Sequence, residues 1–191
     1  MDIDNAIAEL ATKLDKWFDG NKATFASHDD TAQRKAVAHG FEIVKELDKL
    51  KADGIAAITS LLARRNALPA SERSALLIRN FEFAAKLRAV LHDELLDTDG
   101  ANKIVLLMNK MADALDATGN GRAVLGVLLD HIDDRVRATA GAYLLIVNLM
   151  PERVVPILRE IDQRSEGRSA DFTAHWALLD WELKQKALKE K

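Results

Sequence analysis

The sequence predicts an all-α fold of about eight or nine helices, and three observations support this prediction. Leucine, alanine, lysine, glutamate and arginine dominate the 191 residues, and all five are good helix formers. Every segment with a clear period repeats its apolar residues at helical spacing. No segment alternates apolar and polar residues between hairpin turns, as a strand would. Because there are only three prolines and nine glycines, connections should be short and consecutive helices antiparallel.

Four helices are expected in the N-terminal helical region, residues 1–96. The first ends at Gly20, and the second begins in the SHDDT segment of residues 27–31. The Asp-Gly pair at 53–54 is expected to separate the second helix from a third, which ends before Pro69. The fourth helix begins directly after this proline. The apolar stripes of these helices are Ile3, Ile7, Leu10, Leu14 and Trp17; Val37, Phe41, Val44, Leu47 and Leu50; Ile55, Ile58, Leu61 and Leu62; and Leu77, Phe81, Ala84 and Leu87.

A polar corner at residues 92–100 (HDELLDTDG) predicts a boundary, with a C-terminal module at residues 97–191. The alternative is one continuous domain. An apolar helix is expected from about 101 to 117, three more follow within the segment 121–161, and the last begins near Ser169. This last helix has four large apolar side chains on one face, and the aromatic residues among them are expected in the core. The four are Phe172, Trp176, Leu179 and Leu183.

The two aspartates that follow the first helix of the segment 121–161 predict a helix start. Asp133 or Asp134 can accept hydrogen bonds from free backbone N–H groups there, and such a cap contributes about 1 kcal/mol. Val136 begins the buried stripe of the helix, and Arg137 is expected to pair with an aspartate of an adjacent unit. We interpret Asp134, Val136 and Arg137 as a structural corner. Small residues follow, so that a neighbouring helix can approach closely: Ala138, Ala140, Gly141 and Ala142.

This order of features resembles a HEAT repeat: an apolar helix, an aspartate corner, Val-Arg, small residues and a second apolar helix. The sequences LLDHIDDRVRATAGAYLLIVNLMPERVVPILREI and GRSADFTAHWALLDWELKQ also resemble a bacterial family of small HEAT-like domains of unassigned function. This resemblance covers residues 121–186 and implies antiparallel helical hairpins stacked as an α-α superhelix. It also implies a bacterial source, but it indicates no biochemical activity, because the family has none assigned.

The sequence has no pattern that announces catalysis or metal binding. There is no cysteine, no HExxH, no GxSxG, no P-loop and no GxGxxG. The His-Asp-Asp run at 28–30 is better interpreted as a helix cap than as a set of metal ligands. The segment 97–100 lacks the glycine and glutamate positions of a calcium loop. No catalytic residue, cofactor or metal site is therefore predicted, and the chain is expected not to be an enzyme.

A protein–protein interaction scaffold is therefore the leading hypothesis for function. Its most specific version is an immunity or antitoxin-like protein that binds a toxin domain. The net charge is -3, no apolar run approaches a membrane span, and the acidic N-terminus does not resemble a signal peptide. A cytoplasmic location without membrane contact is expected. The predicted partner-binding residues are Asp133, Arg135 and the aromatic Trp181, which should be the more exposed of the two tryptophans in the last helix.

Two alternative functions remain open from the sequence. A HEAT-like nucleic-acid-binding protein, or an enzyme of the DNA glycosylase kind, would need a basic groove. Arg122, Arg135, Arg137 and Arg153 could contribute to such a groove, but acidic residues equal the basic ones in number from residue 121 onward. The second alternative is a helical bundle that carries a ligand or metal in the N-terminal half, although its stripes lack carboxylate–histidine spacing.

Overall fold

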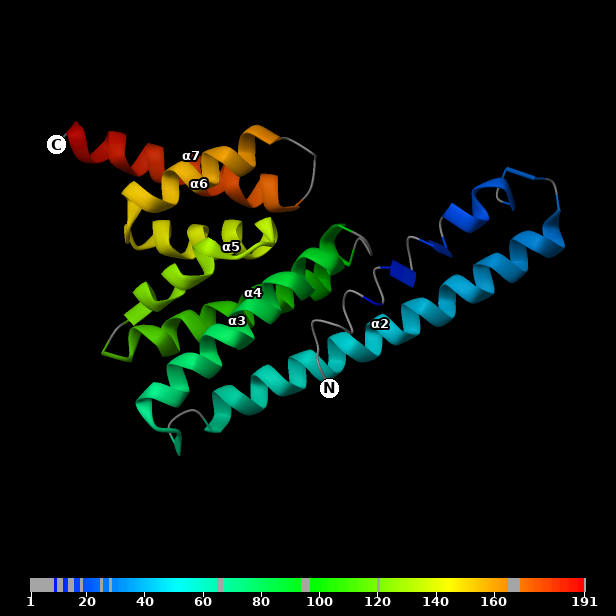
Figure 1. Cartoon of the computed structure of the whole chain (residues 1–191), viewed down its shortest axis with the longest axis horizontal. Helices are drawn as coiled ribbons and strands as arrows, with labels where there is room; N and C mark the ends of the chain where they lie inside the picture. The colour runs from blue at the N-terminus through cyan, green and yellow to red at the C-terminus, as the bar shows by residue number, and fades with distance from the viewer. Residues whose placement is uncertain are drawn as a thin grey trace. The chain divides into compact units, whose positions relative to one another are not determined.

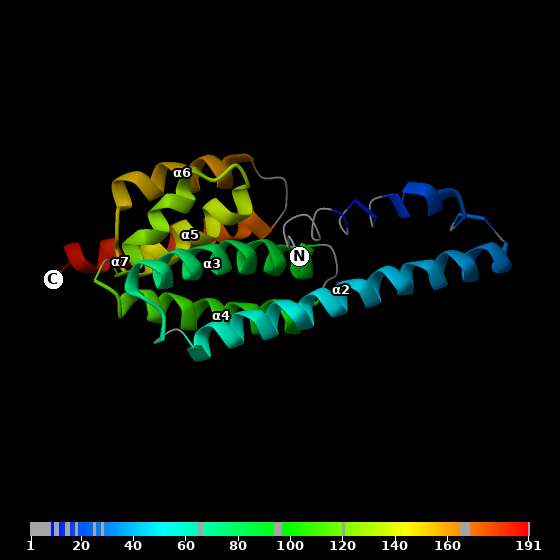
Figure 2. The ribbon, with the colours of Figure 1, turned by 60° about the horizontal axis from the view of Figure 1, so that its bottom comes forward.

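The computed structural model describes residues 9, 12–13, 16–17, 19–24, 26–27, 29–64, 67–93, 97–119, 121–164 and 169–190. Helix is the only regular secondary structure in these ranges, and the prediction of an all-α fold with about eight or nine helices is confirmed. The chain forms two compact units, Met1–Ala57 and Ile58–Lys191 (Figures 1 and 2). Within the same ranges, no helix has both the length and the apolar character that crossing a membrane requires.

Helix α2, Asp30–Arg64, is continuous and belongs to the first unit as far as residue 57. The carboxylate of Asp29 caps it by accepting a hydrogen bond from the N–H of Thr31 at 2.9 Å, as the cap interpretation predicts, while His28 lies outside the described residues. The predicted break at 53–54 is wrong, because Gly54 lies inside the helix. A glycine within a helix costs only about 1 kcal/mol relative to alanine, and the hydrogen bonds of a long helix outweigh that cost.

Trp17 determines which face of α2 is buried in the first unit. Its indole Nε1 donates a hydrogen bond to the carbonyl oxygen of Ala36 at 2.9 Å. A Cβ on Gly40 would lie 2.6 Å from the indole ring, so only glycine allows this approach. Ala36, Gly40 and Ile43 are therefore buried, one residue away from the stripe that the sequence predicted.

The predicted stripe of α2 is largely exposed as a consequence. Val37, Phe41 and Val44 are all exposed, whereas Leu50 is buried as expected. Four residues of the first predicted stripe lie outside the described residues, and so does the side chain of Leu47: the four are Ile3, Ile7, Leu10 and Leu14.

The second unit is a stack of helical hairpins. Helices α3 and α4 pack on each other, α5 packs on η2, and α6 packs on α7. Helix α5 contacts α3, α6 and α7 and therefore lies between the first and last hairpins (Figure 1). The expected boundary at 96–97 falls between α3 and α4, which share a core. The helices are α3 Ala70–Asp93, α4 Thr98–Asp116, η2 Gly121–Asp130, α5 Asp134–Ile146, α6 Pro151–Arg164 and α7 Ser169–Lys189.

Helix η2 is a 3₁₀ helix of ten residues, which is long for this kind of helix. With three residues per turn, side chains three apart lie on one edge. Arg122, Leu125 and Leu128 form a buried edge, whereas Val127 is exposed. The buried arginine donates to Asp116 at the end of α4, with Nη2 2.5 Å from Oδ2. The apolar pattern of residues 121–130 predicted an α-helix, but the structure has a 3₁₀ helix there, which is wound more tightly.

Helix α5 provides the centre of this unit's core. Its Tyr143 ring packs edge-on against Phe81 of α3, with centroids 5.0 Å apart, and its hydroxyl donates to Oδ1 of Asn109 in α4 at 2.6 Å. On another side, a Cβ on Gly141 would lie 2.9 Å from a methyl carbon of Leu158 in α6. The expectation that small residues allow close approach is confirmed at Gly141.

Candidate functional site

Asp133 is the N-cap of α5, as its position in the sequence predicts. Its Oδ1 accepts a hydrogen bond from the N–H of Arg135 at 2.9 Å, and the guanidinium of Arg135 also donates to both carboxylate oxygens. Burial alone would raise the pKa of Asp133, but the hydrogen bonds and positive charge of Arg135 bring it below the ordinary value. Two of the three predicted partner-binding residues, Asp133 and Arg135, are thus engaged with each other at a helix end.

Asp134 joins α5 to α6. It accepts hydrogen bonds from Arg137 within the same helix and from Arg164 Nη1 of α6 at 2.5 Å. The expectation that Arg137 pairs with an aspartate of an adjacent unit is therefore wrong, since Arg137 binds its own helix and Arg164 makes the cross-link. The side chain of Val136 between them is 0% exposed, as expected for the corner.

His131 connects the same corner to α3. Its Nδ1 accepts a hydrogen bond from the N–H of Asp133 at 2.9 Å, so the proton of the neutral ring is on Nε2. This Nε2 donates to Glu82 at 3.1 Å, and Glu82 also pairs with Lys86 at 2.7 Å. Both ring nitrogens are therefore engaged in hydrogen bonds that join the corner to α3.

Trp181 of α7, the third predicted partner-binding residue, is half-buried and lies against the end of α5. Its Nε1 donates to Oδ1 of Asn148 at 3.0 Å. Trp176, which was expected in the core, is 53% exposed. The sequence therefore identified an exposed tryptophan on the correct helix but assigned the exposure to the wrong one.

An exposed apolar line, which we call the α7 stripe, runs along this helix. The residues are 37% to 59% exposed, and the rings of Phe172 and Trp176 meet edge-on with centroids 5.8 Å apart. The opposite face of α7 is buried through Ala170, Ala174 and Leu178. Small alanines let α7 approach α5 closely, and this leaves the larger residues outside. The α7 stripe consists of Phe172, Trp176, Leu179 and Leu183.

Ion pairs border the α7 stripe on both sides. Towards α6, His175 lies 3.3 Å from Asp162, and Glu182 lies 3.0 Å from Arg159. On the other side, Lys184 lies 2.5 Å from Asp180, which is on the same helix. The stripe is therefore an apolar surface with a polar rim, which is the usual anatomy of a protein interface.

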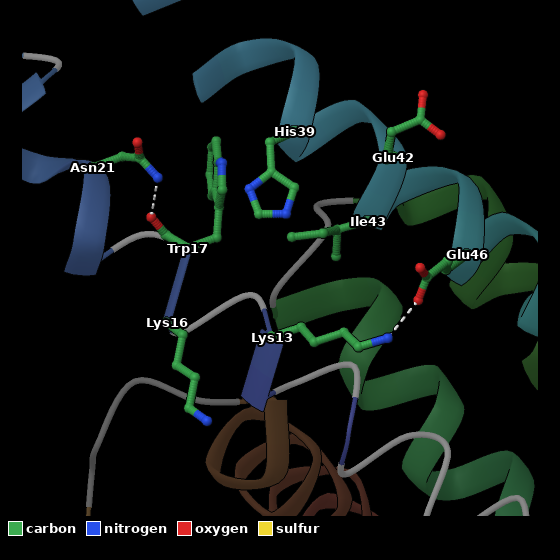
Figure 3. A pocket seen from close by; sticks show the side chains of 8 residues that line it. All are labelled: Lys13, Lys16, Trp17, Asn21, His39, Glu42, Ile43 and Glu46. Atoms are coloured by element: carbon green, nitrogen blue, oxygen red, sulfur yellow. Dashed lines mark hydrogen bonds and ion pairs between the residues drawn. The ribbon is translucent and has the colours of Figure 1, made fainter. Parts of the chain in front are cut away.

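A hollow of about 400 Å³ lies in the first unit (Figure 3). Trp17, His39 and Ile43 border it, and Lys13 donates to Glu46 at 2.8 Å on its edge. That hydrogen bond and the charge of Glu46 raise the pKa of Lys13. The remaining lining residues described are Lys16, Asn21 and Glu42. The lining has two lysines and two glutamates, so these side chains give the hollow no net charge with which to select a charged ligand.

The arginines proposed for a basic groove are each paired with an aspartate. Arg122 binds Asp116, Arg135 binds Asp133 and Arg137 binds Asp134; Arg153 also binds Asp130 at 2.6 Å. These pairs neutralise the charge that phosphate contacts would need. No group of three or more acidic or histidine side chains within the described ranges could hold a metal ion.

The fold and these surfaces define an all-α protein of packed helical hairpins with an exposed apolar stripe. No family model matches the chain, and neither the curated proteins nor the solved structures contain a match.

Proposed function

We propose that this chain is a non-enzymatic protein–protein interaction scaffold of the HEAT-like kind, and that the α7 stripe is its binding surface. The observation that carries the proposal is that α7 is apolar on two opposite faces. One face packs on α5 through Ala174 and Leu178, and the other presents Phe172 and Trp176 to solvent. An apolar face of a helix is normally covered by another element, and the outer face of α7 is not covered by any helix described.

The position of the stripe in the stack supports the same proposal. In stacked helical repeats each unit covers the apolar face of its neighbour, and a terminal unit has a polar outer face. Helix α7 lies in the last hairpin described, yet its outer face has aromatic residues and leucines instead of charges. A contiguous exposed apolar surface rimmed by polar groups marks an interaction site.

A protein suits this surface better than nucleic acid or a membrane does. The charges beside the stripe include Glu182 and Asp180, which would repel phosphate, and the rim cations described above pair with carboxylates of the chain. Aromatic side chains such as Phe172 and Trp176 are enriched at the centres of protein interfaces.

A photo-cross-linking experiment in cells tests the proposal. The amino acid p-benzoylphenylalanine replaces Phe172 in the full chain, and the matched control places it at Leu106, an exposed apolar residue of α4 outside the stripe. We expect position 172 to form a discrete protein–protein product that is lost when Leu183→Asp is added. If position 172 forms no protein product, or only the product formed by position 106, the stripe is not a protein interface.

A further inference from the structure

We infer that the occupant of the α7 stripe is the same stripe of a second copy of this chain, with the two helices antiparallel. This inference builds on the proposed function, since it names the partner of the proposed interface. The spacing of the stripe is the first reason. Phe172, Trp176, Leu179 and Leu183 are four, three and four residues apart, which is the a/d spacing of helices that pair by knobs-into-holes packing.

The order of large and small side chains is the second reason. The stripe has two aromatic residues followed by two leucines, and its spacing is the same in both directions. When two copies are antiparallel about a two-fold axis midway between Trp176 and Leu179, Phe172 meets the partner's Leu183. Trp176 then meets the partner's Leu179. Each layer combines a large residue with a smaller one, which allows close interdigitation.

A parallel pair would not pack in this way. It would oppose two tryptophans in one layer and two leucines in another, so that layers would be unequally thick. The antiparallel pair is also self-complementary about a two-fold axis, which is the commonest symmetry of homo-oligomers.

The charges beside the stripe are compatible with the antiparallel pair. Helical geometry puts His175 and Glu182 on the same flank of α7. In an antiparallel pair, this flank of one helix lies beside the same flank of the partner helix. His175 then lies near the partner's Glu182, and Lys186 lies near the partner's Asp171, each pair offset by two residue steps, or about 3 Å, along the helix axis. Lys186 and the partner's Asp171 have opposite charges, which favours the antiparallel direction.

The size of the interface predicts a weak dimer. The stripe extends over eleven residue steps, or about 16 Å of helix. A single helix pair of this length buries less than about 1,200 Å², which is the lower end for specific interfaces. We therefore expect a dissociation constant on the order of micromolar, so that the monomer–dimer equilibrium is measurable at ordinary protein concentrations.

Because the chain has no cysteine, introduced cysteines give a direct test of partner and direction. Phe172→Cys and Leu183→Cys are made in separate full-length chains, which leaves the Trp176 and Leu179 layers intact. In the antiparallel pair position 172 of one copy faces position 183 of the other, whereas the two 172 positions are about 16 Å apart along the helix. A disulfide requires Cα atoms within about 7 Å.

We expect the mixture of the two variants, under mild oxidation, to form covalent dimers in several-fold excess over either variant alone. Sedimentation equilibrium should show wild-type dimers that Trp176→Asp abolishes and Leu106→Asp does not. A Phe172→Cys chain that dimerises as well alone as in the mixture would overturn the antiparallel arrangement. A wild-type chain that stays monomeric up to about 1 mM would overturn the second copy as occupant.

The two proposals fail in different ways. If the wild-type chain is monomeric and the cross-linker at position 172 captures a different protein, the interface proposal stands and the second copy is excluded. An intrachain product from position 172 also excludes the second copy. If no product forms at all, both proposals are wrong.

Discussion

Trp181 and Asn148 join the last helix to the end of α5 through one hydrogen bond, from the indole Nε1 to Oδ1 at 3.0 Å. Asn148 has a φ of 55°, in the left-handed region that ends many helices. The N–H of Leu149 reaches back to the carbonyl of Leu144, and that of Asn148 reaches the carbonyl of Leu145, both at 2.9 Å. The asparagine therefore ends α5 and positions Trp181 at the same time.

Asn148→Ala should lower the free energy of unfolding by about 2 kcal/mol. It removes a hydrogen bond worth about 1 kcal/mol, and alanine lacks the short polar side chain that lets asparagine tolerate the left-handed conformation, which costs about 1 kcal/mol more. Asn148→Gly removes only the hydrogen bond, so its effect should be smaller by about 1 kcal/mol. Urea unfolding measures both, with Asn102→Ala on the exposed face of α4 as the control. Equal losses for alanine and glycine would show that the backbone conformation contributes nothing.

Gly141→Val should destabilise the second unit by about 1–3 kcal/mol, because a branched side chain would overlap Leu158 and Val154 of α6. Gly141→Ala should be nearly neutral, since the helix propensity of alanine offsets the smaller overlap. Gly119→Ala is the matched control, as no atom lies within 4 Å of a Cβ there. Thermal melts followed by circular dichroism measure the three variants. A Gly141→Val chain that melts with the control would contradict the close approach of α5 and α6.

Val136→Asp should destabilise the second unit by more than about 2 kcal/mol, because it buries an unpaired carboxylate on the core-facing side of α5. Arg135→Ala should cost about 1 kcal/mol or less, since Asp133 keeps its backbone cap when the partly exposed ion pair is lost. Chemical unfolding of the two variants separates these cases. Similar losses would mean that the assigned register of α5 is incorrect.

Tyr143 should titrate far above an ordinary tyrosine. Burial, opposed in part by Arg88 and Arg122, raises its pKa from 10.0 to about 12 in the folded chain. Because the folded pKa exceeds the unfolded one, this group's contribution to stability is complete below pH 10 and is lost as the pH rises towards 12. The chain has a single tyrosine, so absorbance near 295 nm reports on Tyr143 alone. Phenolate formation near pH 10 before unfolding would contradict its burial; the urea-unfolded chain provides the reference.

The helices of the second unit were largely predictable because their signals are local. The aspartate cap at Asp133 and the buried Val136 follow from positions at a helix start. The face on which α7 packs was not predictable in the same way, because α7 has two apolar faces. The large side chains of Phe172 and Trp176 predict that their face is buried. In the structure the face with the small side chains of Ala170 and Ala174 is buried instead, because it lets α7 approach α5 more closely.

The first unit shows a different limit of the sequence. Trp17 and Gly40 are 23 positions apart along the chain, and their contact determines which face of α2 is buried. Periodicity alone selected Val37 and Phe41, which have the larger side chains. The Asp-Gly pair at 53–54 is a local turn signal, whereas the continuity of α2 through Gly54 depends on the hydrogen bonds of the whole helix, which a local pattern does not show.

The three tryptophans of the chain lie in three different settings. Trp17 is in the first unit against Gly40, Trp176 is in the α7 stripe, and Trp181 is at the joint between α5 and α7. Three variants that each keep one of these tryptophans would each have one built-in fluorophore at a known place. Their emission would report separately on opening of the first unit, occupation of the stripe and melting of the stack.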